Sequence, residues 1–379
     1  MSNSDFSRDE EAYKALGVKH ALHDEALDKI KFLTLFCSSI NFIILSGPTG
    51  VGKTHLLKRL VLAIWEAFAT LVQTVPSCVP VLFTTAVAHG ARSFDFKRLY
   101  RDGLIGLGDL FVDRRMAHGV RRAGDVVVDR VSTTTSEMRY ALECEFQERG
   151  TKFWIIDEAQ HILLGGKSGS VVDQFDVLKS IAQTSDIKIL LCGTYRLPEL
   201  LRISGQVMRR SSTVQYNCYR SNVEEELRQF VSVAKTLMSK LPVNGFPDAA
   251  ANADLFYGGS LGCVGVLKDW IARAWAAAHF AGRSEIILDD FLSTKIDNEA
   301  LEQMIDEIAW GDAGHGKLEW RLNRNGKGTA KNVCRKGKQA KGSAHPRRPG
   351  ERNPTRDRVG PMKPKTDGAA SEGEEKSDD

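Results

Sequence analysis

The amino-acid sequence predicts an α/β fold, in which a five-stranded parallel β-sheet lies between helices and is followed by a small helical lid and a disordered basic tail. Short apolar runs rich in β-branched residues alternate with helical patterns over residues 21–221, and this alternation is typical of βαβ units. Over residues 222–310 only amphipathic helical patterns continue. Residues 311–379 are rich in Gly, Lys, Arg, Pro and Ser, so they bury too little apolar surface to offset the entropy of folding.

The elements of this fold follow from the spacing of the apolar residues. A polar leader covers residues 1–20, and a helix is predicted over 21–36. Buried strands are predicted at residues 41–46, 79–87, 153–159, 187–194 and 212–219. Further helices are predicted at residues 54–72, 134–150, 173–186, 198–210, 223–241, 258–280 and 298–311. The helix over 134–150 begins with a capping box, because Thr134 stands three residues before Glu137.

Composition is typical of a globular protein of the cytoplasm. Hydrophobic residues make up 42% of the chain and charged residues 26%, which is enough to build a core. The seven cysteines are scattered without a CxxC pair, so they predict reduced thiols and neither a disulfide framework nor a zinc site. The first residues are polar and acidic, unlike a secretory signal, and no apolar run approaches the roughly 18 residues of a membrane span. We therefore expect no contact with a membrane.

The net charge of +4 conceals an asymmetry between the body of the chain and its tail. Residues 321–365 carry fifteen Lys or Arg and two acidic residues, whereas residues 366–379 carry six acidic residues and one Lys. No aromatic residue follows Trp320, which disfavours stacking of this tail on nucleic-acid bases. The tail is either an arm that binds DNA non-specifically or docks a protein, or a solubilising linker.

One motif, GPTGVGKT at residues 47–54, matches the phosphate-binding pattern GxxxxGK[ST] in full. A predicted strand precedes it and an amphipathic helix follows it, as this loop requires; a chance match in a turn is the alternative. The glycines let backbone N–H groups approach phosphates, and the helix N-terminus adds partial positive charge. We expect Lys53 to neutralise the β- and γ-phosphates and Thr54 to bind Mg²⁺. The expected nucleotide-binding residues are Gly47, Pro48, Thr49, Gly50, Val51, Gly52, Lys53, Thr54 and His55.

Two acidic residues in the segment FWIIDEA complete this site. We expect Asp157 to reach the Mg²⁺, directly or through water, and Glu158 to polarise the attacking water, as phosphoryl transfer requires. Two solvated acids at an ordinary strand end are the alternative. Together with the phosphate loop, the pair predicts hydrolysis of ATP and not binding alone.

Two further candidate sites accompany the later strands. Thr194 comes at the end of the fourth strand, where its hydroxyl could sense the γ-phosphate; a simple strand-to-helix turn is the alternative. Arg209 and Arg210 stand just before the fifth strand, where an arginine could reach the nucleotide of a neighbouring subunit as a trans arginine finger. A solvated basic surface is the alternative for this pair.

In this order of motifs the chain resembles the AAA+ superfamily and, more specifically, the TnsC/TniB group of transposition regulators, with MuB as a more distant functional analogue. The resemblance covers about residues 21–310 and rests on NFIILSGPTGVGKTHLLKRL, SFDFKRLYRDGLIGLGDL, FWIIDEAQHIL, ILLCGTYRLPELL and GGSLGCVGVLKDWIARA. The phrases DEAQHI and GGSLG favour this group over other AAA+ motors. One feature departs from many AAA+ lids, because the turn GGSLGCVGVLK holds no arginine and Lys268 is the nearest basic residue.

The resemblance implies an ATPase of the bacterial cytoplasm that uses ATP and Mg²⁺ and assembles with its own copies into rings or helical filaments on double-stranded DNA. Such proteins mark a target site and recruit and activate the transposase, which then triggers hydrolysis and disassembly. A target selector, either a protein or an RNA-guided CRISPR-associated complex, would be a further partner. The resemblance implies the same roles for the residues at the nucleotide site, namely Lys53, Thr54, Asp157 and Glu158. It also implies that Arg209 or Arg210 is the trans finger.

Basic residues recur between residues 89 and 139, but acidic residues are interspersed, so the local excess of positive charge is small. On the residues alone a solvated surface is the alternative; the resemblance implies contacts with the DNA backbone from this stretch. Such contacts position a protein on DNA without reading its sequence. The candidate DNA-contact residues, which flank helix ends expected to face a central pore, are Lys97, Arg101, Arg130, Thr133, Thr134 and Thr135.

Two other functions remain open at this point. An AAA+ helicase loader or replication initiator would share the core and deliver a helicase, whereas a transposase gene beside this one would favour transposition. A signalling ATPase that acts without DNA would report its nucleotide state to an effector domain, and no folded effector domain is predicted in this sequence.

Overall fold

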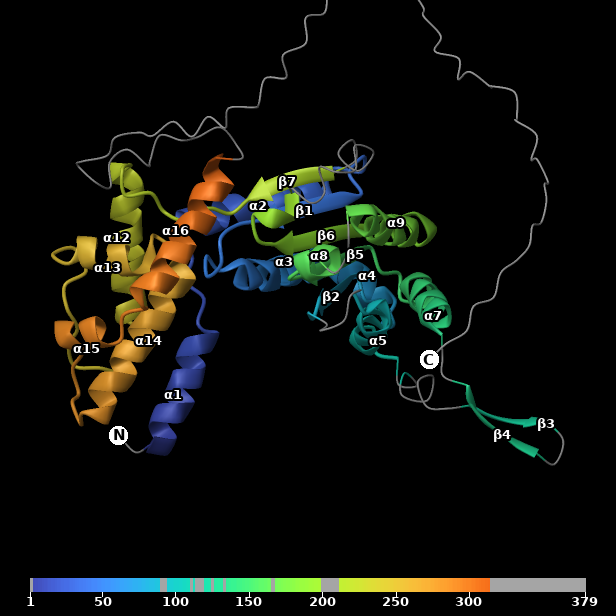
Figure 1. Cartoon of the computed structure of the whole chain (residues 1–379), viewed down its shortest axis with the longest axis horizontal. Coiled ribbons are helices and arrows are strands. Elements are labelled where there is room, and N and C mark those ends of the chain that lie inside the picture. Colours follow the sequence, from blue (N-terminus) through green and yellow to red (C-terminus); the bar gives the residue numbers. More distant parts are fainter. Residues whose placement is uncertain are drawn as a thin grey trace, which may run out of the picture. The chain divides into compact units, whose positions relative to one another are not determined.

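The computed structural model describes residues 3–88, 94–109, 112, 119–123, 126–131, 134–164, 168–198 and 211–313. Its main sheet has the strand order β2–β5–β6–β1–β7, and all neighbouring strands in it are parallel (Figure 1). The strands are β1 Phe42–Ser46, β2 Val81–Thr85, β5 Phe153–Asp157, β6 Lys188–Gly193 and β7 Ser211–Gln215. The predicted five-stranded parallel sheet is therefore confirmed.

Helices cover both faces of this sheet. Within the described residues, the helices before β7 include α1 Asn3–Ala15, α2 Ala21–Leu35, α3 Lys53–Ala67, α4 Ala69–Thr74, α5 Phe96–Gly106, α7 Thr135–Glu148, α8 Gln160–Leu164 and α9 Ser168–Thr184. Alternate residues of a strand point to opposite faces. Phe42 and Ile44 of β1 accordingly share a hydrophobic core with α5, α7 and α9, and Ile43 and Leu45 share another with α2 and α3. Burial on both sides explains why these strands are continuous apolar runs.

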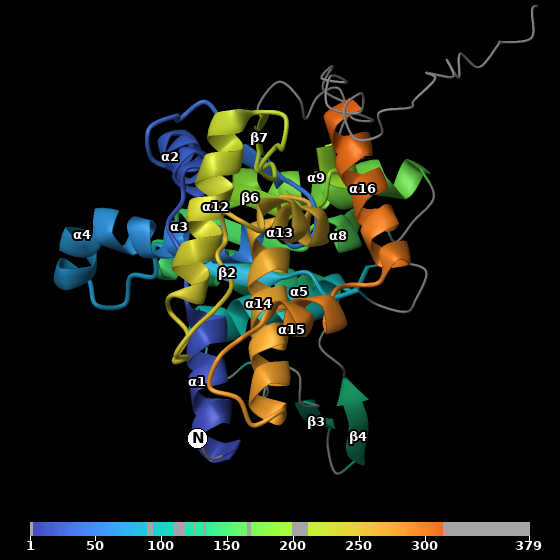
Figure 2. The same ribbon diagram turned by 90° about the vertical axis from the view of Figure 1, so that its left-hand side faces the viewer.

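The helices after β7 are α12 Glu224–Met238, α13 Ala253–Ser260, α14 Val264–Phe280, α15 Leu288–Ser293 and α16 Asn298–Ala313. Most of them share a core built around Trp270, which is fully buried and donates from Nε1 to the carbonyl of Phe291 at 2.9 Å. Helix α1 lies beside α14 (Figures 1 and 2), and the Phe6 ring centroid is 4.7 Å from that of Trp275. The segment expected only as a polar leader therefore contains a helix that packs through its few apolar residues.

Several elements differ from the sequence-based expectation. The helix predicted over 258–280 is divided, because Leu261 and Gly262 adopt left-handed conformations with φ 55° and 74° between α13 and α14. Only glycine fits at 262, since a Cβ there would lie 2.1 Å from the carbonyl oxygen of Tyr219. Helix α3 ends at Ala67, and α4 replaces the rest of the helix expected to residue 72. Helices α5 and α15 and the antiparallel pair β3 Gly119–Ala123 and β4 Val126–Val131 were not predicted.

Helix α16 continues to Ala313, and the remainder of the expected tail, residues 314–379, lies outside the described residues. The helix predicted over 198–210 also lies almost entirely outside them. Among the helices that the structure describes, none is long and apolar enough to cross a membrane.

Candidate nucleotide-binding site

The glycine-rich motif forms the turn between β1 and α3. Gly50 has a φ of 76° and Gly52 a φ of 108°, and these left-handed conformations favour glycine. Gly52 is the N-cap of α3. Because glycine has no side chain, this residue does not cap the first N–H groups of the helix. A helix N-terminus with uncapped N–H groups attracts anions. The turn is therefore built as a cradle for a phosphate group.

Lys53 lies inside this cradle although its side chain is charged. The residue is only 8% exposed, and its ammonium donates to the carbonyl oxygens of Gly47 at 3.0 Å and Pro48 at 2.9 Å. A buried ammonium needs such acceptors because burial disfavours its charge. Phosphate oxygens carry negative charge and are stronger acceptors for the same amine. The location of Lys53 thus suits its predicted role.

Thr54 and Asp157 meet between the first turn of α3 and the end of β5. The Thr54 hydroxyl donates to Asp157 Oδ2 at 2.7 Å, although the two residues are 103 positions apart. Asp157 is 3% exposed, and its other oxygen accepts from the N–H of Glu158 at 2.9 Å. A hydroxyl and a carboxylate side by side are hard oxygen donors of the kind that Mg²⁺ prefers. These residues fit the predicted Mg²⁺ site.

Glu158 follows directly, in a left-handed conformation with φ 54° that is uncommon for a residue other than glycine. The next N–H, that of Ala159, donates to the carbonyl of Cys192 at 2.7 Å and ties this turn to β6. The Glu158 carboxylate accepts a short hydrogen bond from Nε2 of Gln160. Gln160 belongs to the segment DEAQHI, but nothing in that pattern predicted a role for its side chain.

Thr194 lies at the same edge of the sheet. It is half-buried and follows β6 directly, and the carbonyl of the preceding Gly193 accepts from the N–H of Gly47 at 3.3 Å. The end of β6 is therefore hydrogen-bonded to the first residue of the phosphate loop.

Cys192, in the same strand, is fully buried. Burial, reinforced by the negative charge of Asp157, raises the pKa of its thiol well above the usual value. Cys192 is thus a neutral packing residue.

The helices after β7 contact the phosphate loop, which the sequence did not predict. The N–H of Val266, in the first turn of α14, donates to the carbonyl of Gly50 at 3.1 Å. From α16, Glu307 accepts from the N–H of Thr49 at 3.4 Å and from its hydroxyl at 3.3 Å. A backbone hydrogen bond and a carboxylate from these helices therefore border the loop.

Two basic residues near the loop are engaged elsewhere. The ammonium of Lys268 donates to the carbonyl oxygens of Lys14 and Leu16 at 2.6 and 2.7 Å, at the end of α1. The His55 ring lies against that of His23 in α2, with 5.6 Å between ring centroids. Burial, followed by the positive field of His23 when it is charged, lowers the pKa of His55. The backbone of His55 belongs to the first turn of α3, while its side chain faces α2.

The arginine pair proposed as a trans finger, Arg209 and Arg210, lies outside the described residues. Strand β7 begins directly after it at Ser211, which pairs with Phe42 at the start of β1. The phosphate loop follows the other end of β1, about 13 Å farther along at roughly 3.3 Å per residue. Ser211, the described residue next to this pair in sequence, therefore lies at the end of β1 opposite the loop of its own chain.

The candidate DNA-contact residues that the structure describes lie on separate elements. Lys97 and Arg101 stand one turn apart on α5, are both half-buried, and are accompanied by Asp102, 3.9 Å from the Arg101 guanidinium. Thr134 forms the predicted capping box of α7: its hydroxyl accepts from the N–H of Glu137 at 3.2 Å, and its own N–H donates to the Glu137 carboxylate at 2.7 Å. The Thr134 hydroxyl therefore already has a structural partner.

The remaining candidates give little geometry. Thr135 is the exposed first residue of α7, Arg130 belongs to β4 with its side chain undescribed, and Thr133 lies outside the described residues.

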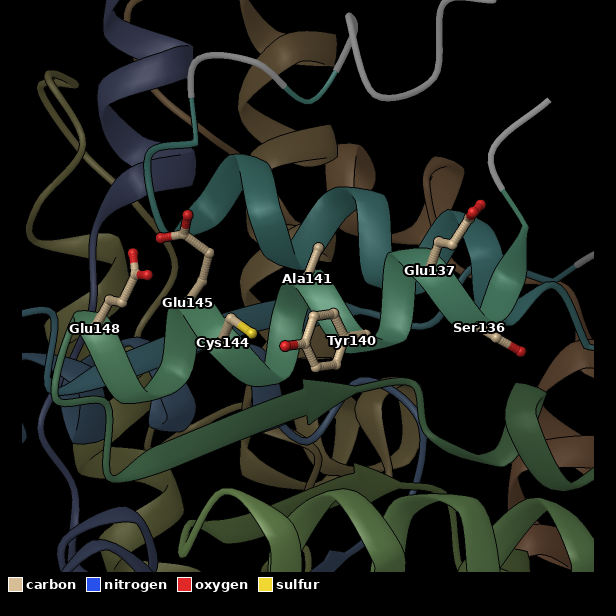
Figure 3. A pocket seen from close by; sticks show the side chains of 7 residues that line it. All are labelled: Ser136, Glu137, Tyr140, Ala141, Cys144, Glu145 and Glu148. Atoms are coloured by element: carbon tan, nitrogen blue, oxygen red, sulfur yellow. The ribbon is translucent and has the colours of Figure 1, made fainter. Parts of the chain in front are cut away.

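The exposed face of α7 is acidic (Figure 3). A hollow of about 540 Å³ on this face is lined by Ser136, Glu137, Tyr140, Ala141, Cys144, Glu145 and Glu148. Carboxylates repel phosphates, so this face disfavours the DNA backbone.

A comparison with models of protein families supports the fold. Residues 38–201 match the family model described as an AAA domain. The ORC2 protein of Aeropyrum pernix in its ADP form is 17% identical, with a TM-score of 0.49, over 72% of this chain and 66% of that chain. The ORC1 protein of Aeropyrum pernix in complex with DNA is 15% identical, with a TM-score of 0.49, over 73% of this chain and 65% of that chain.

A third structure, domain III of the replication initiation protein DnaA of Thermotoga maritima, is 13% identical, with a TM-score of 0.43, over 74% of this chain and 94% of that chain. The chain spans just under two thirds of the length of the two ORC proteins. No protein of curated function matches the sequence significantly.

The matched region contains β1, β2, β5 and β6, the phosphate loop, and the Asp157–Glu158 pair. The loop follows a central strand of a parallel sheet, and the acidic pair follows the next strand but one, so the motifs and the sheet order agree with each other. Residues 38–201 match an AAA domain, and the chain has the AAA+ P-loop NTPase fold.

Proposed function

We propose that this chain is an ATP-dependent, DNA-binding regulator of DNA transposition. ATP holds its subunits together as a ring or helical filament on double-stranded DNA, where they recruit and activate the transposase and link it to a target selector. ATP hydrolysis then releases the assembly. The observation that carries the ATPase part is the hydrogen bond from Thr54 to Asp157 with Glu158 beside it. The transposition part rests on the sequence resemblance carried by DEAQHI and GGSLG.

Each residue of the nucleotide site has its own proposed role in hydrolysis. The first N–H groups of α3 and the Lys53 ammonium complement the negative charge of the β- and γ-phosphates. Thr54 and Asp157 would hold Mg²⁺, which neutralises charge that develops on the phosphates. Glu158 would orient the attacking water and take up its proton. Thr194, at the same sheet edge, would donate a hydrogen bond to the γ-phosphate.

Glu158→Gln is the first test, because it keeps the size of the side chain and removes its basicity. We expect the variant to bind ATP with nearly wild-type affinity, to lose about 100-fold or more in turnover, and to remain as an oligomer on DNA. Glu148→Gln, on the exposed face of α7, is a matched control that should hydrolyse ATP normally. Unchanged turnover in Glu158→Gln would refute the assignment of Glu158 as the base.

The trans finger is proposed because the arginine pair directly precedes β7 in sequence, and the first residue of β7 pairs with the end of β1 opposite the phosphate loop. A variant with Arg209 and Arg210 both replaced by Ala should bind ATP but hydrolyse it slowly, whereas Lys53→Ala should bind ATP poorly. When the two inactive proteins are mixed, the intact arginines of one complete the intact loop of the other, and turnover should partly recover. A mixture with no more activity than the separate proteins would show that the finger does not act in trans.

DNA contact through the phosphate backbone predicts a steep dependence on salt. Affinity for duplex DNA should fall strongly between low and moderate salt, because each neutralised phosphate releases counterions. Replacing Lys97 and Arg101 with Ala should weaken binding and reduce the slope of log K against log salt by about 1 for each phosphate that is no longer neutralised. Lys235→Ala, an exposed lysine on α12, is the control. A flat salt response would reject the proposal.

Transposition and replication functions are separated by the partner that responds. A regulator of transposition should stimulate strand transfer by its transposase, which a gene next to that of this chain would identify, when ATP and target DNA are present. Loading of a helicase onto DNA, with no effect on a transposase, would instead identify a helicase loader or replication initiator. Both outcomes require the same nucleotide site, so neither can be judged from ATP turnover alone.

A further inference from the structure

Gln160, the first residue of α8, is a buried polar side chain to which the proposed reaction gives no role. It is 6% exposed, and its Nε2 donates to Oε2 of Glu158. Its other polar atom, Oε1, is buried, and none of the described residues donates to it. An unpaired buried acceptor destabilises a protein, and an apolar side chain would avoid that cost. Packing alone therefore does not explain why residue 160 carries an amide side chain.

Packing restricts the orientation of this amide. A Cβ at Gly193 would lie 2.3 Å from Gln160 Oε1, so the oxygen end of the amide lies directly against the last residue of β6. The carbonyl of Gly193 accepts from the N–H of Gly47, so β6 at this point also contacts the phosphate loop. The Gln160 amide thus lies between the end of β6 and Glu158, with its N–H end toward the carboxylate.

We propose that Gln160 is a positioning residue that holds the Glu158 carboxylate for the attack of water on ATP. The N–H of Gln160 binds Oε2 of Glu158, which restricts the rotation of a flexible side chain and leaves Oε1 for the water. This inference rests on the proposed function, because it takes Glu158 as the base.

The test measures steady-state ATP turnover in two variants of Gln160, Gln160→Ala and Gln160→Glu, and in the control variant Gln174→Glu. Gln160→Ala removes the donor, so kcat should fall by about tenfold or more while KM for ATP changes by less than about twofold, because phosphate binding does not involve this amide. Gln160→Glu places a second carboxylate against Glu158, and two adjacent carboxylates resist double ionisation. Near neutral pH the two carboxyl groups share one proton, which keeps a donor between them, whereas toward alkaline pH both ionise and repel each other. The kcat of Gln160→Glu should therefore fall toward alkaline pH relative to the wild type, which a purely structural defect would not produce.

Gln174→Glu is the matched control. Gln174 lies on α9, is 8% exposed, and has a buried Oε1 without a partner among the described residues, so it resembles Gln160 in burial and chemistry. None of the hydrogen bonds found in the described parts of the chain joins it to the nucleotide site. The control should keep the wild-type kcat and pH profile, even if its thermal unfolding temperature falls.

The outcomes separate this inference from the proposed function. If Glu158→Gln abolishes turnover while both Gln160 variants match the control in kcat and pH profile, the inference is wrong and the ATPase assignment stands. If Glu158→Gln leaves turnover unchanged, Glu158 is not the base, and both that assignment and the inference fail. Should Gln160→Glu not fold, Gln160→Asn replaces it, because its shorter side chain keeps the amide but draws the N–H away from Glu158. A wild-type kcat in Gln160→Asn and Gln160→Ala would overturn the inference.

Discussion

Gly265, in the first turn of α14, allows this helix to approach the phosphate loop, and Gly265→Ala should push the two apart. A Cβ at residue 265 would lie 2.3 Å from the carbonyl oxygen of Gly50 and 3.1 Å from its carbonyl carbon. Close C···O contacts in proteins are roughly 3.3 Å or longer, so the start of α14 would move by about 1 Å. That movement would break the 3.1 Å hydrogen bond from Val266 to Gly50.

The expected loss of stability follows from these distances. Steric overlap in a packed region costs about 1–3 kcal/mol, and the broken hydrogen bond costs about 1 kcal/mol. Alanine offsets up to about 1 kcal/mol through its higher helix propensity. The net change is a destabilisation of about 2 kcal/mol, which lowers Tm by roughly 3 °C for a folded part of about 280 residues. Because the Gly50 carbonyl moves or loses its partner, nucleotide affinity should fall as well.

Gly258→Ala provides a matched control in the neighbouring helix α13. No atom lies within 4 Å of a Cβ at Gly258, so alanine should raise stability by its helix propensity alone. Thermal unfolding followed by circular dichroism, and titration with a fluorescent ATP analogue, measure both effects. Equal Tm values and equal affinities for the two variants would refute the close approach of α14 to the loop.

Three further predictions concern pH, charge and capping. Burial, followed by the charge of His23, lowers the pKa of His20 from 6.5 to about 4, so the unfolded chain is protonated first and stability falls as pH drops from 6.5 toward 4. On the order of 2 kcal/mol should be lost by pH 5, measured by urea unfolding, and His20→Gln should lose less. Glu307→Gln should tighten ATP binding about two- to fivefold at low salt by removing a negative charge beside the loop, whereas the exposed Glu302→Gln should not. Thr134→Ala removes the cap of α7 and should lower the free energy of unfolding by about 1 kcal/mol, with exposed Ser136→Ala nearly neutral.

The parts of the molecule that were predictable have local signals. Each strand of the main sheet is an apolar run of a few residues, and the phosphate loop and the Thr134 capping box are contiguous patterns. The meeting of Thr54 with Asp157 was also predictable, because strand ends of a parallel sheet lie at one edge. A local sequence pattern predicts the structure of its segment correctly when the packing of the whole fold favours the same structure.

Other interactions depend on residues that meet only in the folded chain. Glu307 and Thr49 are 258 positions apart, and neither stands in a pattern that points to the other. Helix α1 has few apolar residues, so its packing depends on Trp275 and could not be inferred from its own polar sequence. Gln160 is close to Glu158 in sequence, but their hydrogen bond requires the left-handed turn at Glu158, which no sequence rule predicts for glutamate.

ATP-controlled binding to DNA is tested most directly by the affinity for a labelled duplex, measured by fluorescence anisotropy with Mg²⁺ and either a non-hydrolysable ATP analogue, ADP or no nucleotide. We expect the ATP analogue to tighten binding by about tenfold or more relative to ADP, and Lys53→Ala to remove the difference. Equal affinity in all three nucleotide conditions would contradict a function in which ATP closes an assembly around DNA.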